Sequence, residues 1–108
     1  MERRLFLLQR LTAMLLAPLV LVHVGLILVA IRGGLTAAEI LGRTQGSVGW
    51  GLFYGVFVLA AAVHAPIGLR NILVEWTPLG RRPAGWLAIA FGLLVLVLGL
   101  CAVLAVVA

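Results

Sequence analysis

An imidazole, an amide and a carboxylate fall on one face of an otherwise apolar predicted helix. The segment "AAVHAPIGLRNILVEW", residues 61–76, contains His64, Asn71 and Glu75. At about 100° per residue, these positions and Gly68 lie within an arc of roughly 60°. A histidine in such a helix can bind a cofactor, transfer protons or hydrogen-bond to a neighbouring helix. Packing alone does not explain three polar groups on one face. The stripe therefore predicts contact with a cofactor that has polar substituents, and Gly68 leaves room for a flat ring.

The composition indicates that lipid surrounds this helix. Hydrophobic residues make up 65% of the 108 residues and charged residues 10%, against roughly 45–50% and 25% in soluble domains. The mean hydropathy is +1.29. A soluble fold of this length buries only ~60–70% of its unfolded surface, so the remaining apolar surface would aggregate in water. The sequence therefore predicts a lipid bilayer as the partner of this surface.

Three stretches are long enough to cross the ~30 Å hydrocarbon core, which takes ~20 apolar residues per helix. They are residues 11–31, 48–69 and 85–107. None shows the alternation of a barrel strand. The predicted fold class is an all-α membrane protein with three transmembrane helices in one domain, residues 1–108. The first stretch exceeds the ~7–15 apolar residues of a signal peptide, so we expect it to be retained.

The arginines predict the orientation, because the chain contains no lysine. The first loop holds only Arg32 and Arg43, whereas six arginines lie in the N-terminal segment and the second loop: Arg3, Arg4, Arg10, Arg70, Arg81 and Arg82. The positive-inside rule then predicts a cytoplasmic N-terminus. We expect a multi-pass protein of the inner (cytoplasmic) membrane of a bacterium. The charges form no basic face, so we expect no nucleic-acid partner.

Some smaller features agree with a helical membrane protein. Trp50, Trp76 and Trp86 fall near the ends of the spans, as an interfacial aromatic belt requires. The segment "LTAAEILGR" in the first loop favours a short amphipathic helix.

The second loop is expected to start at Arg70, where the second apolar span ends. Pro66 predicts a kink, which either is ordinary or re-aims His64.

Two motifs resemble one family of membrane proteins. The segment "HAPIGLRNILVEW", residues 64–76, resembles the pattern H-x-x-x-G-[IL]-R-[HN]-hydrophobic-x-x-[DE]. The segment "QRLTAMLL", residues 9–16, is similar to [HQ]-R-[LIV]-[ST]-[GA]. Both patterns are found in the cytochrome b membrane-anchor subunits of succinate dehydrogenase and fumarate reductase. Length, three spans and orientation also agree, so the resemblance covers nearly the whole chain.

The resemblance implies a haem site on the second span. His64 would be an axial ligand of a b-type haem iron, and Arg70 and Asn71 would lie near the haem propionates. Many relatives have a second histidine where this chain has Asn71. An amide carries no positive charge, so neutralisation of the propionates would fall more heavily on Arg70.

The resemblance also implies a quinone site at the cytoplasmic end of the first span. Arg10 and Thr12 would line a pocket for ubiquinone or menaquinone, with Gln9 nearby. Relatives have a serine where this chain has Phe6, which removes one expected hydrogen bond. Glu75 or water would supply protons when the quinone is reduced.

The implied function is that of an anchor subunit in a respiratory complex of the tricarboxylic acid cycle. An iron–sulfur subunit and a flavoprotein subunit would dock at the cytoplasmic face, and the anchor would pass electrons to quinone. The chain has no flavin motif and no iron–sulfur cysteines, so it is not catalytic alone. Two alternatives remain: a haem-free, quinone-binding anchor, and a small non-redox scaffold or transporter. A transporter would place ionisable groups along a path at the membrane midplane. Here most of them lie at one end of the spans, which disfavours a transporter.

His23 is predicted to lie further from the cytoplasmic face than His64. Arg10 and Arg70 mark the cytoplasmic ends of the first and second spans. At 1.5 Å per residue, His23 is ~20 Å from Arg10, whereas His64 is ~9 Å from Arg70. Two ligands of one upright haem should lie at similar depth, so we expect the second ligand of the His64 haem to come from another anchor chain or a second copy. The three helices would then belong to a larger bundle. His23 either binds a further haem iron or hydrogen-bonds between helices.

Overall fold

The computed structural model describes residues 2–108, with side chains from Arg3 onward, and these residues form four helices. They are α1 (Glu2–Gly33), α2 (Ala37–Thr44), α3 (Val48–Trp76) and α4 (Arg81–Val107). α1, α3 and α4 are each long and apolar enough to cross a membrane. The prediction of an all-α membrane protein with three transmembrane helices is confirmed. The bundle is 47 Å long, close to the ~40–45 Å of a bilayer with its headgroups.

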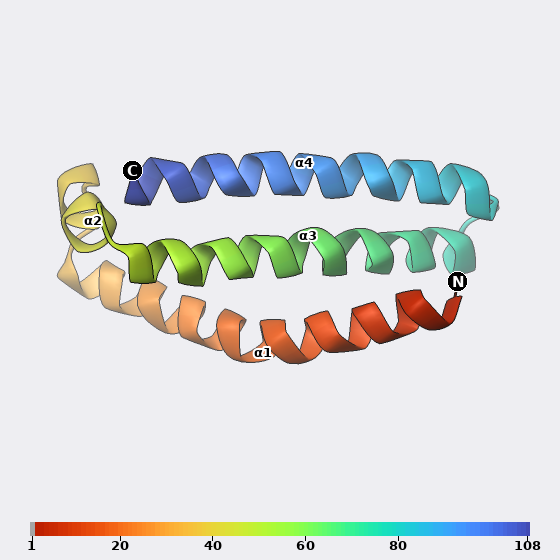
Figure 1. Ribbon diagram of the computed structural model, residues 1–108, viewed down its shortest axis with the longest axis horizontal. Helices are drawn as coiled ribbons and strands as arrows, with labels where there is room; N and C mark the ends of the chain where they lie inside the picture. Colours follow the sequence, from red (N-terminus) through yellow and green to blue (C-terminus); the bar gives the residue numbers. More distant parts are fainter. Residues whose placement is uncertain (1) are drawn as a thin grey trace.

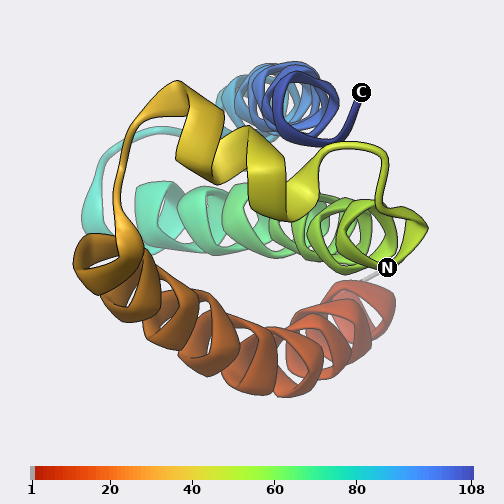
Figure 2. The ribbon, with the colours of Figure 1, turned by 90° about the vertical axis from the view of Figure 1, so that its left-hand side faces the viewer.

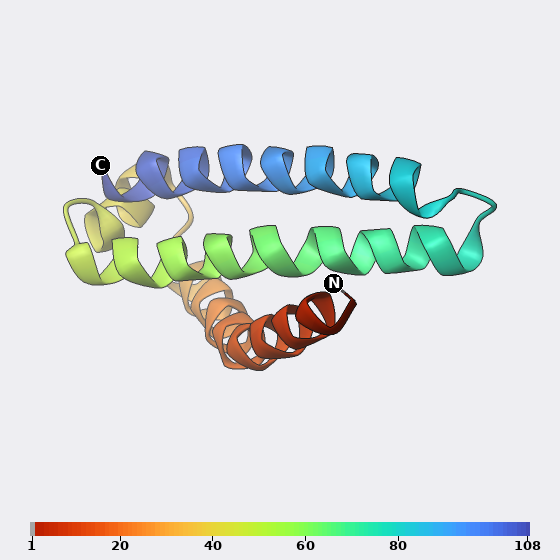
Figure 3. The ribbon, with the colours of Figure 1, turned by 45° about the vertical axis from the view of Figure 1, so that its right-hand side comes forward.

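α3 lies between α1 and α4, and each long helix runs antiparallel to the next (Figure 1). The start of α1, the end of α3 and the start of α4 therefore meet at one end of the bundle, which we call the arginine-rich end. α2 and the C-terminus lie at the opposite end. Figure 3 shows that α1 is inclined to the α3–α4 pair, which stay nearly parallel.

α3 extends two turns beyond the point where the sequence analysis placed the second loop. The helix does not end at Arg70, because no helix breaker occurs between Arg70 and Thr77. Asn71 and Glu75 therefore lie on α3, as the polar stripe requires. Thr77 has an extended backbone, with φ −130° and ψ 162°, as expected of a residue that precedes proline. The backbone amide of Thr77 donates to the carbonyl of Leu73 at 3.2 Å, and its hydroxyl donates to the same carbonyl, so both groups of this residue close the helix end.

The short helix expected in the first loop is present as α2. Its N-cap is Thr36, whose hydroxyl accepts a hydrogen bond of 3.2 Å from the amide of Glu39. The other end is tied to α4: Thr44 Oγ1 donates to the carbonyl of Val106 at 2.5 Å, and the amide of Gly46 donates to the carbonyl of Val107 at 2.7 Å. α2 therefore lies across this end of the bundle (Figure 2).

Two glycines bring α4 close to α3. A Cβ added to Gly92 would lie 2.9 Å from Pro66 Cγ, and one added to Gly99 would lie 2.6 Å from Val58 Cγ1. Small residues at helix contacts allow this approach within a membrane. The ring of Pro66 thus packs against α4. His64, two residues earlier and about 200° away around the helix, is on the other side of α3.

The apolar surface of the bundle points outward. Among residues 3–108, the buried residues are few and mostly small: Leu16, Thr44, Ala60, Ile67, Ala84 and Ala88. Large side chains on all three long helices remain exposed, such as Leu21 at 73% and Leu93 at 59%. Water would make this arrangement unfavourable, whereas lipid tails cover it without cost.

Candidate functional site

The structure joins the two sequence motifs through one hydrogen bond. Thr12 Oγ1 on α1 lies 3.2 Å from His64 Nδ1 on α3. Both side chains are half-buried where the two helices meet. The motif at the start of the chain and the motif at its centre therefore form one site.

The hydroxyl of Thr12 is placed to favour one tautomer of His64. It has one proton to donate, and this proton is directed within its own helix, to the carbonyl of Leu8 at 2.7 Å, with the carbonyl of Gln9 at 3.2 Å. With its proton directed there, the hydroxyl can accept from His64 only in the tautomer that is protonated at Nδ1. In that tautomer Nε2 has a free lone pair, which is the form in which a neutral imidazole binds a metal.

Gly68, one turn from His64, faces α1. A Cβ at this position would lie 3.2 Å from Gln9 Nε2. Gln9 Oε1 is buried and has no hydrogen-bond partner among the described residues. The space that the sequence analysis reserved for a flat ring is therefore taken by the Gln9 amide, which would have to turn away before a ring could contact Gly68.

The remaining polar residues of α3 continue toward the arginine-rich end. Arg70 Nη1 donates to Asn71 Oδ1 at 3.2 Å, and both residues are half-buried. Arg70 lies ~9 Å further along the helix than His64. Glu75 is exposed in the last turn of α3. Imidazole, guanidinium, amide and carboxylate thus follow one another from the interior of the bundle to its surface.

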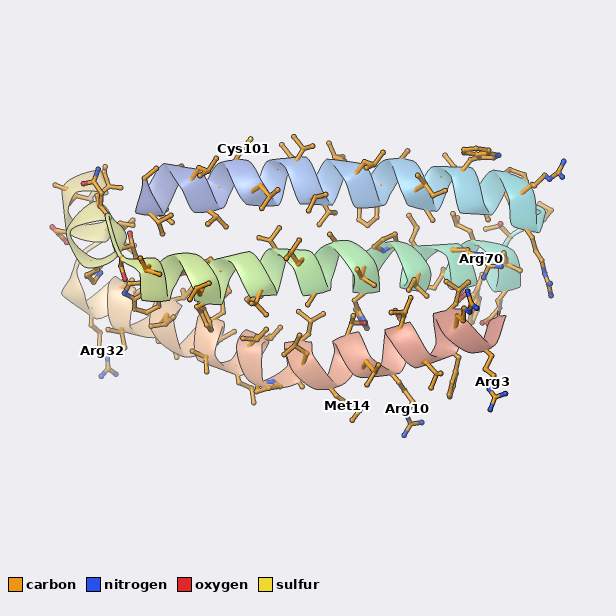
Figure 4. The ribbon with its side chains drawn as sticks, viewed as in Figure 1. Arg3, Arg10, Met14, Arg32, Arg70 and Cys101 are labelled. Atoms are coloured by element: carbon orange, nitrogen blue, oxygen red, sulfur yellow. The ribbon has the colours of Figure 1, made fainter. Side chains whose placement is uncertain are left out.

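Arg10 does not join this group. Its side chain is exposed and points away from α3 (Figure 4), and its guanidinium carbon lies 5.9 Å from the centre of the Phe6 ring. The structure brings Gln9 and Thr12 to α3 but leaves Arg10 on the outer face of α1. Any pocket that includes Arg10 is therefore open on this outer face within the single chain.

His23 lies in a different layer of the bundle, among aromatic rings. Its ring packs edge-on against Phe57, with centroids 5.1 Å apart, and against Tyr54 at 6.2 Å. Its Nδ1 is buried without a hydrogen-bond partner among the described residues. A cavity of about 360 Å³ borders this histidine and reaches Thr44 of α2 and Gly99 of α4. Phe57 precedes His64 by about two turns, or ~10 Å, so the two histidines differ in depth.

Tyr54 is a neighbour of His23 that was not predicted from the sequence. The signal was a run of aromatic residues at helical spacing, Trp50, Phe53, Tyr54 and Phe57, which forms a stripe on α3. The described residues contain no group of three or more His, Cys, Asp or Glu side chains that could hold a metal ion. One chain thus offers single imidazoles at two depths.

Comparison with known families agrees with the two motifs. The family described as succinate dehydrogenase/fumarate reductase transmembrane subunit matches residues 3–107. This is nearly the whole chain, so the protein belongs to that family, and the resemblance inferred from the motifs is confirmed. No curated protein and no solved structure matched the chain.

Proposed function

We propose that this chain is the membrane anchor of a succinate dehydrogenase, which binds haem b and quinone and passes electrons from an iron–sulfur subunit to the quinone. The iron–sulfur subunit and a flavoprotein subunit would dock at the arginine-rich end. Membership of the family supports the class of protein. The observation that carries the haem assignment is the 3.2 Å contact between Thr12 and His64.

The residues around His64 fit a haem. A b-type haem takes its axial ligands from protein side chains, commonly histidine. His64 would offer Nε2 as that ligand, and the contact with Thr12 would hold the ring in the required tautomer and orientation. Bound haem would supply a one-electron redox centre. His23 lies at a different depth, so the second ligand would come from another anchor chain or a second copy of this one.

Arg70 and Asn71 would lie on the propionate side of this haem. Arg70 supplies a positive charge, and its bond to Asn71 Oδ1 leaves the amide nitrogen of Asn71 as a further donor. Gly68 would border the ring once the Gln9 amide has turned away. His23 would bind a further haem iron or, as its aromatic surroundings favour, serve helix packing.

The quinone would be bound beside α1, because Gln9 and Arg10 are the donors available there. The carbonyl oxygens of a quinone accept hydrogen bonds, and the proton of Thr12 is already engaged with Leu8. Donation would therefore fall to Arg10 and to the amide of Gln9, with Thr12 as part of the wall. Since Arg10 points outward, a second anchor chain would close the pocket. Glu75, exposed at the arginine-rich end, would supply protons.

A reduced-minus-oxidised spectrum of the complex, purified through a tag on this chain, tests the proposal. We expect a b-type band that disappears in H64A while the flavoprotein and iron–sulfur subunits still co-purify. The matched variant H23A should keep the band. Co-purification without any band in the native complex would favour the haem-free anchor, and a chain that brings down neither soluble subunit would favour a non-redox scaffold.

A further inference from the structure

Four arginines from all three long helices line one open pocket of about 730 Å³ at the arginine-rich end. We call this set the basic patch: Arg3, Arg70, Arg81 and Arg82. Trp86 also lines it, and no acidic side chain does so among residues 3–108. Counted from the sequence, this end carries six of the eight arginines and two glutamates, Glu2 and Glu75. The patch therefore has a surplus of positive charge.

Two of these arginines occupy an unfavourable position on their own helix. Arg81 and Arg82 lie in the first turn of α4, which contains no acidic residue, and the N-cap residue Gly80 makes no side-chain capping bond. The positive end of the helix dipole disfavours cations there and favours an anion. A bound anion would offset both the dipole and the mutual repulsion of the arginines.

An apolar groove leads from the basic patch toward the middle of the bundle. This α3–α4 groove has a volume of about 550 Å³ and is lined by residues such as Val63, Pro66, Ala88, Gly92 and Leu96. It shares Arg70, Gly85 and Ile89 with the pocket of the basic patch, so the two are continuous.

The length of the groove matches one leaflet of a bilayer. On α4 it runs from Gly85 to Leu96, which is roughly 16 Å at 1.5 Å per residue. Half of the hydrocarbon core is ~15 Å. Trp86, which is 70% exposed, lies at the patch end, where amphipathic aromatic rings are found at membrane interfaces.

We propose that the basic patch and the α3–α4 groove together bind an anionic phospholipid of the leaflet at this end. The phosphate lies among the arginines, and one acyl chain lies along the groove. Basic pockets between transmembrane helices are known to hold such headgroups. The site adjoins the proposed haem site at Arg70, which lines both the patch and the groove, but neither His64 nor Thr12 lines the groove.

The combination of charge and groove distinguishes a lipid from other occupants. A soluble subunit can contact the arginines but cannot reach the groove, which descends between transmembrane segments. A free phosphate has no apolar part to fill the groove, and a quinone has no charge for the arginines. Only an anionic amphiphile uses both parts of the site.

The charge half of the site is tested with the double variant R81Q/R82Q. The complex, purified in detergent through a tag on this chain, is titrated with phosphatidylglycerol, and bound lipid is counted by native mass spectrometry. At about fivefold per arginine near a membrane surface, we expect roughly thirtyfold weaker binding. R4Q is the control, since it removes an exposed charge of α1 at the same end but outside the patch. It should change binding less than twofold.

The acyl-chain half is tested with G85L. Nothing lies within 4 Å of a Cβ at Gly85, so the leucine fits the helix but fills the entrance of the groove. We expect at least tenfold weaker phosphatidylglycerol binding with all arginines intact. The matched control is G25L on α1, where a Cβ also meets open space and which lies outside the groove. It should bind as the native chain does.

Four results would overturn the proposal. Equal binding of phosphatidylglycerol and of phosphatidylcholine with the same acyl chains would remove the role of the arginines. Native binding by G85L, or competition by millimolar inorganic phosphate, would indicate a bare anion site. Unchanged lipid binding by R81Q/R82Q, together with loss of a soluble subunit, would show that the patch is a protein-docking surface.

Discussion

His64 and His23 are the same residue type in the same bundle, yet their surroundings differ. His64 has Nδ1 bound to a hydroxyl of the neighbouring helix, with guanidinium and amide groups one to two turns further on. His23 is packed edge-on against two aromatic rings, and its Nδ1 is buried without a partner among the described residues. The ring of His64 is oriented by a hydrogen bond, whereas the ring of His23 is oriented only by packing against aromatic side chains.

This difference suggests how a membrane protein prepares an imidazole for a cofactor. A ligand nitrogen needs a fixed tautomer, and a hydrogen bond to the other nitrogen provides it. Aromatic packing restricts the ring without selecting a tautomer. The roles of the two histidines can therefore be distinguished by variants. These remove the hydroxyl of Thr12, the imidazole of His23 or the close contact between Gly68 and Gln9.

The largest effect is expected from T12V, which keeps the volume at this position and removes the hydroxyl. His64 Nδ1 would lose its hydrogen-bond partner, and loss of such a partner typically weakens metal binding by about 10–100-fold. We expect lower haem occupancy in the purified complex and a shifted midpoint potential. T12S keeps the hydroxyl and should restore both values; a T12V complex with native haem content and potential would contradict the role of Thr12.

A smaller effect is expected from H23F, which removes the unpartnered nitrogen and keeps an aromatic ring beside Phe57 and Tyr54. A buried polar atom without a partner costs about 1–3 kcal/mol, so we expect the variant to be about 1 kcal/mol more stable. Thermal unfolding in detergent measures this change, and the haem content should not fall. A loss of half the haem would instead show that His23 binds a second haem iron.

The smallest effect is expected from G68A compared with G55A. A Cβ at Gly55 meets open space, whereas one at Gly68 comes within 3.2 Å of Gln9 Nε2. Alanine favours a helix over glycine by about 0.5–1 kcal/mol, so G55A should be stabilised by this amount. G68A should gain a few tenths of a kcal/mol less, because Gln9 must shift. Equal melting temperatures would mean that Gln9 is not held against Gly68.

Much of the fold follows from local sequence. Three long apolar stretches predict three spans because a helix satisfies its backbone hydrogen bonds within itself, so lipid can surround it. The short helix after Thr36 was also predictable, since capping residues act over a few positions. Arg70 marks the limit of the apolar span, and the backbone stays helical beyond it until Thr77 and Pro78.

The sites were only partly predictable. The motif residues His64, Gly68, Arg70 and Asn71 were identified from type and spacing on one helix, and their roles as ligands remain proposals. Thr12 was assigned to a quinone pocket, and its bond to His64 was missed because residues 52 positions apart share no local signal. The joined patch and groove at the arginine-rich end were missed for the same reason.

The sequence by itself determined that this chain crosses a membrane three times, which end carries the positive charge and which family it resembles. These properties depend on composition and on short-range spacing, which each segment carries independently. Only the tertiary structure decided that Thr12 faces His64, that Arg10 faces outward and that His23 lies among aromatic rings. The rotation of each helix about its axis is set by packing between helices, and no single helix contains that information.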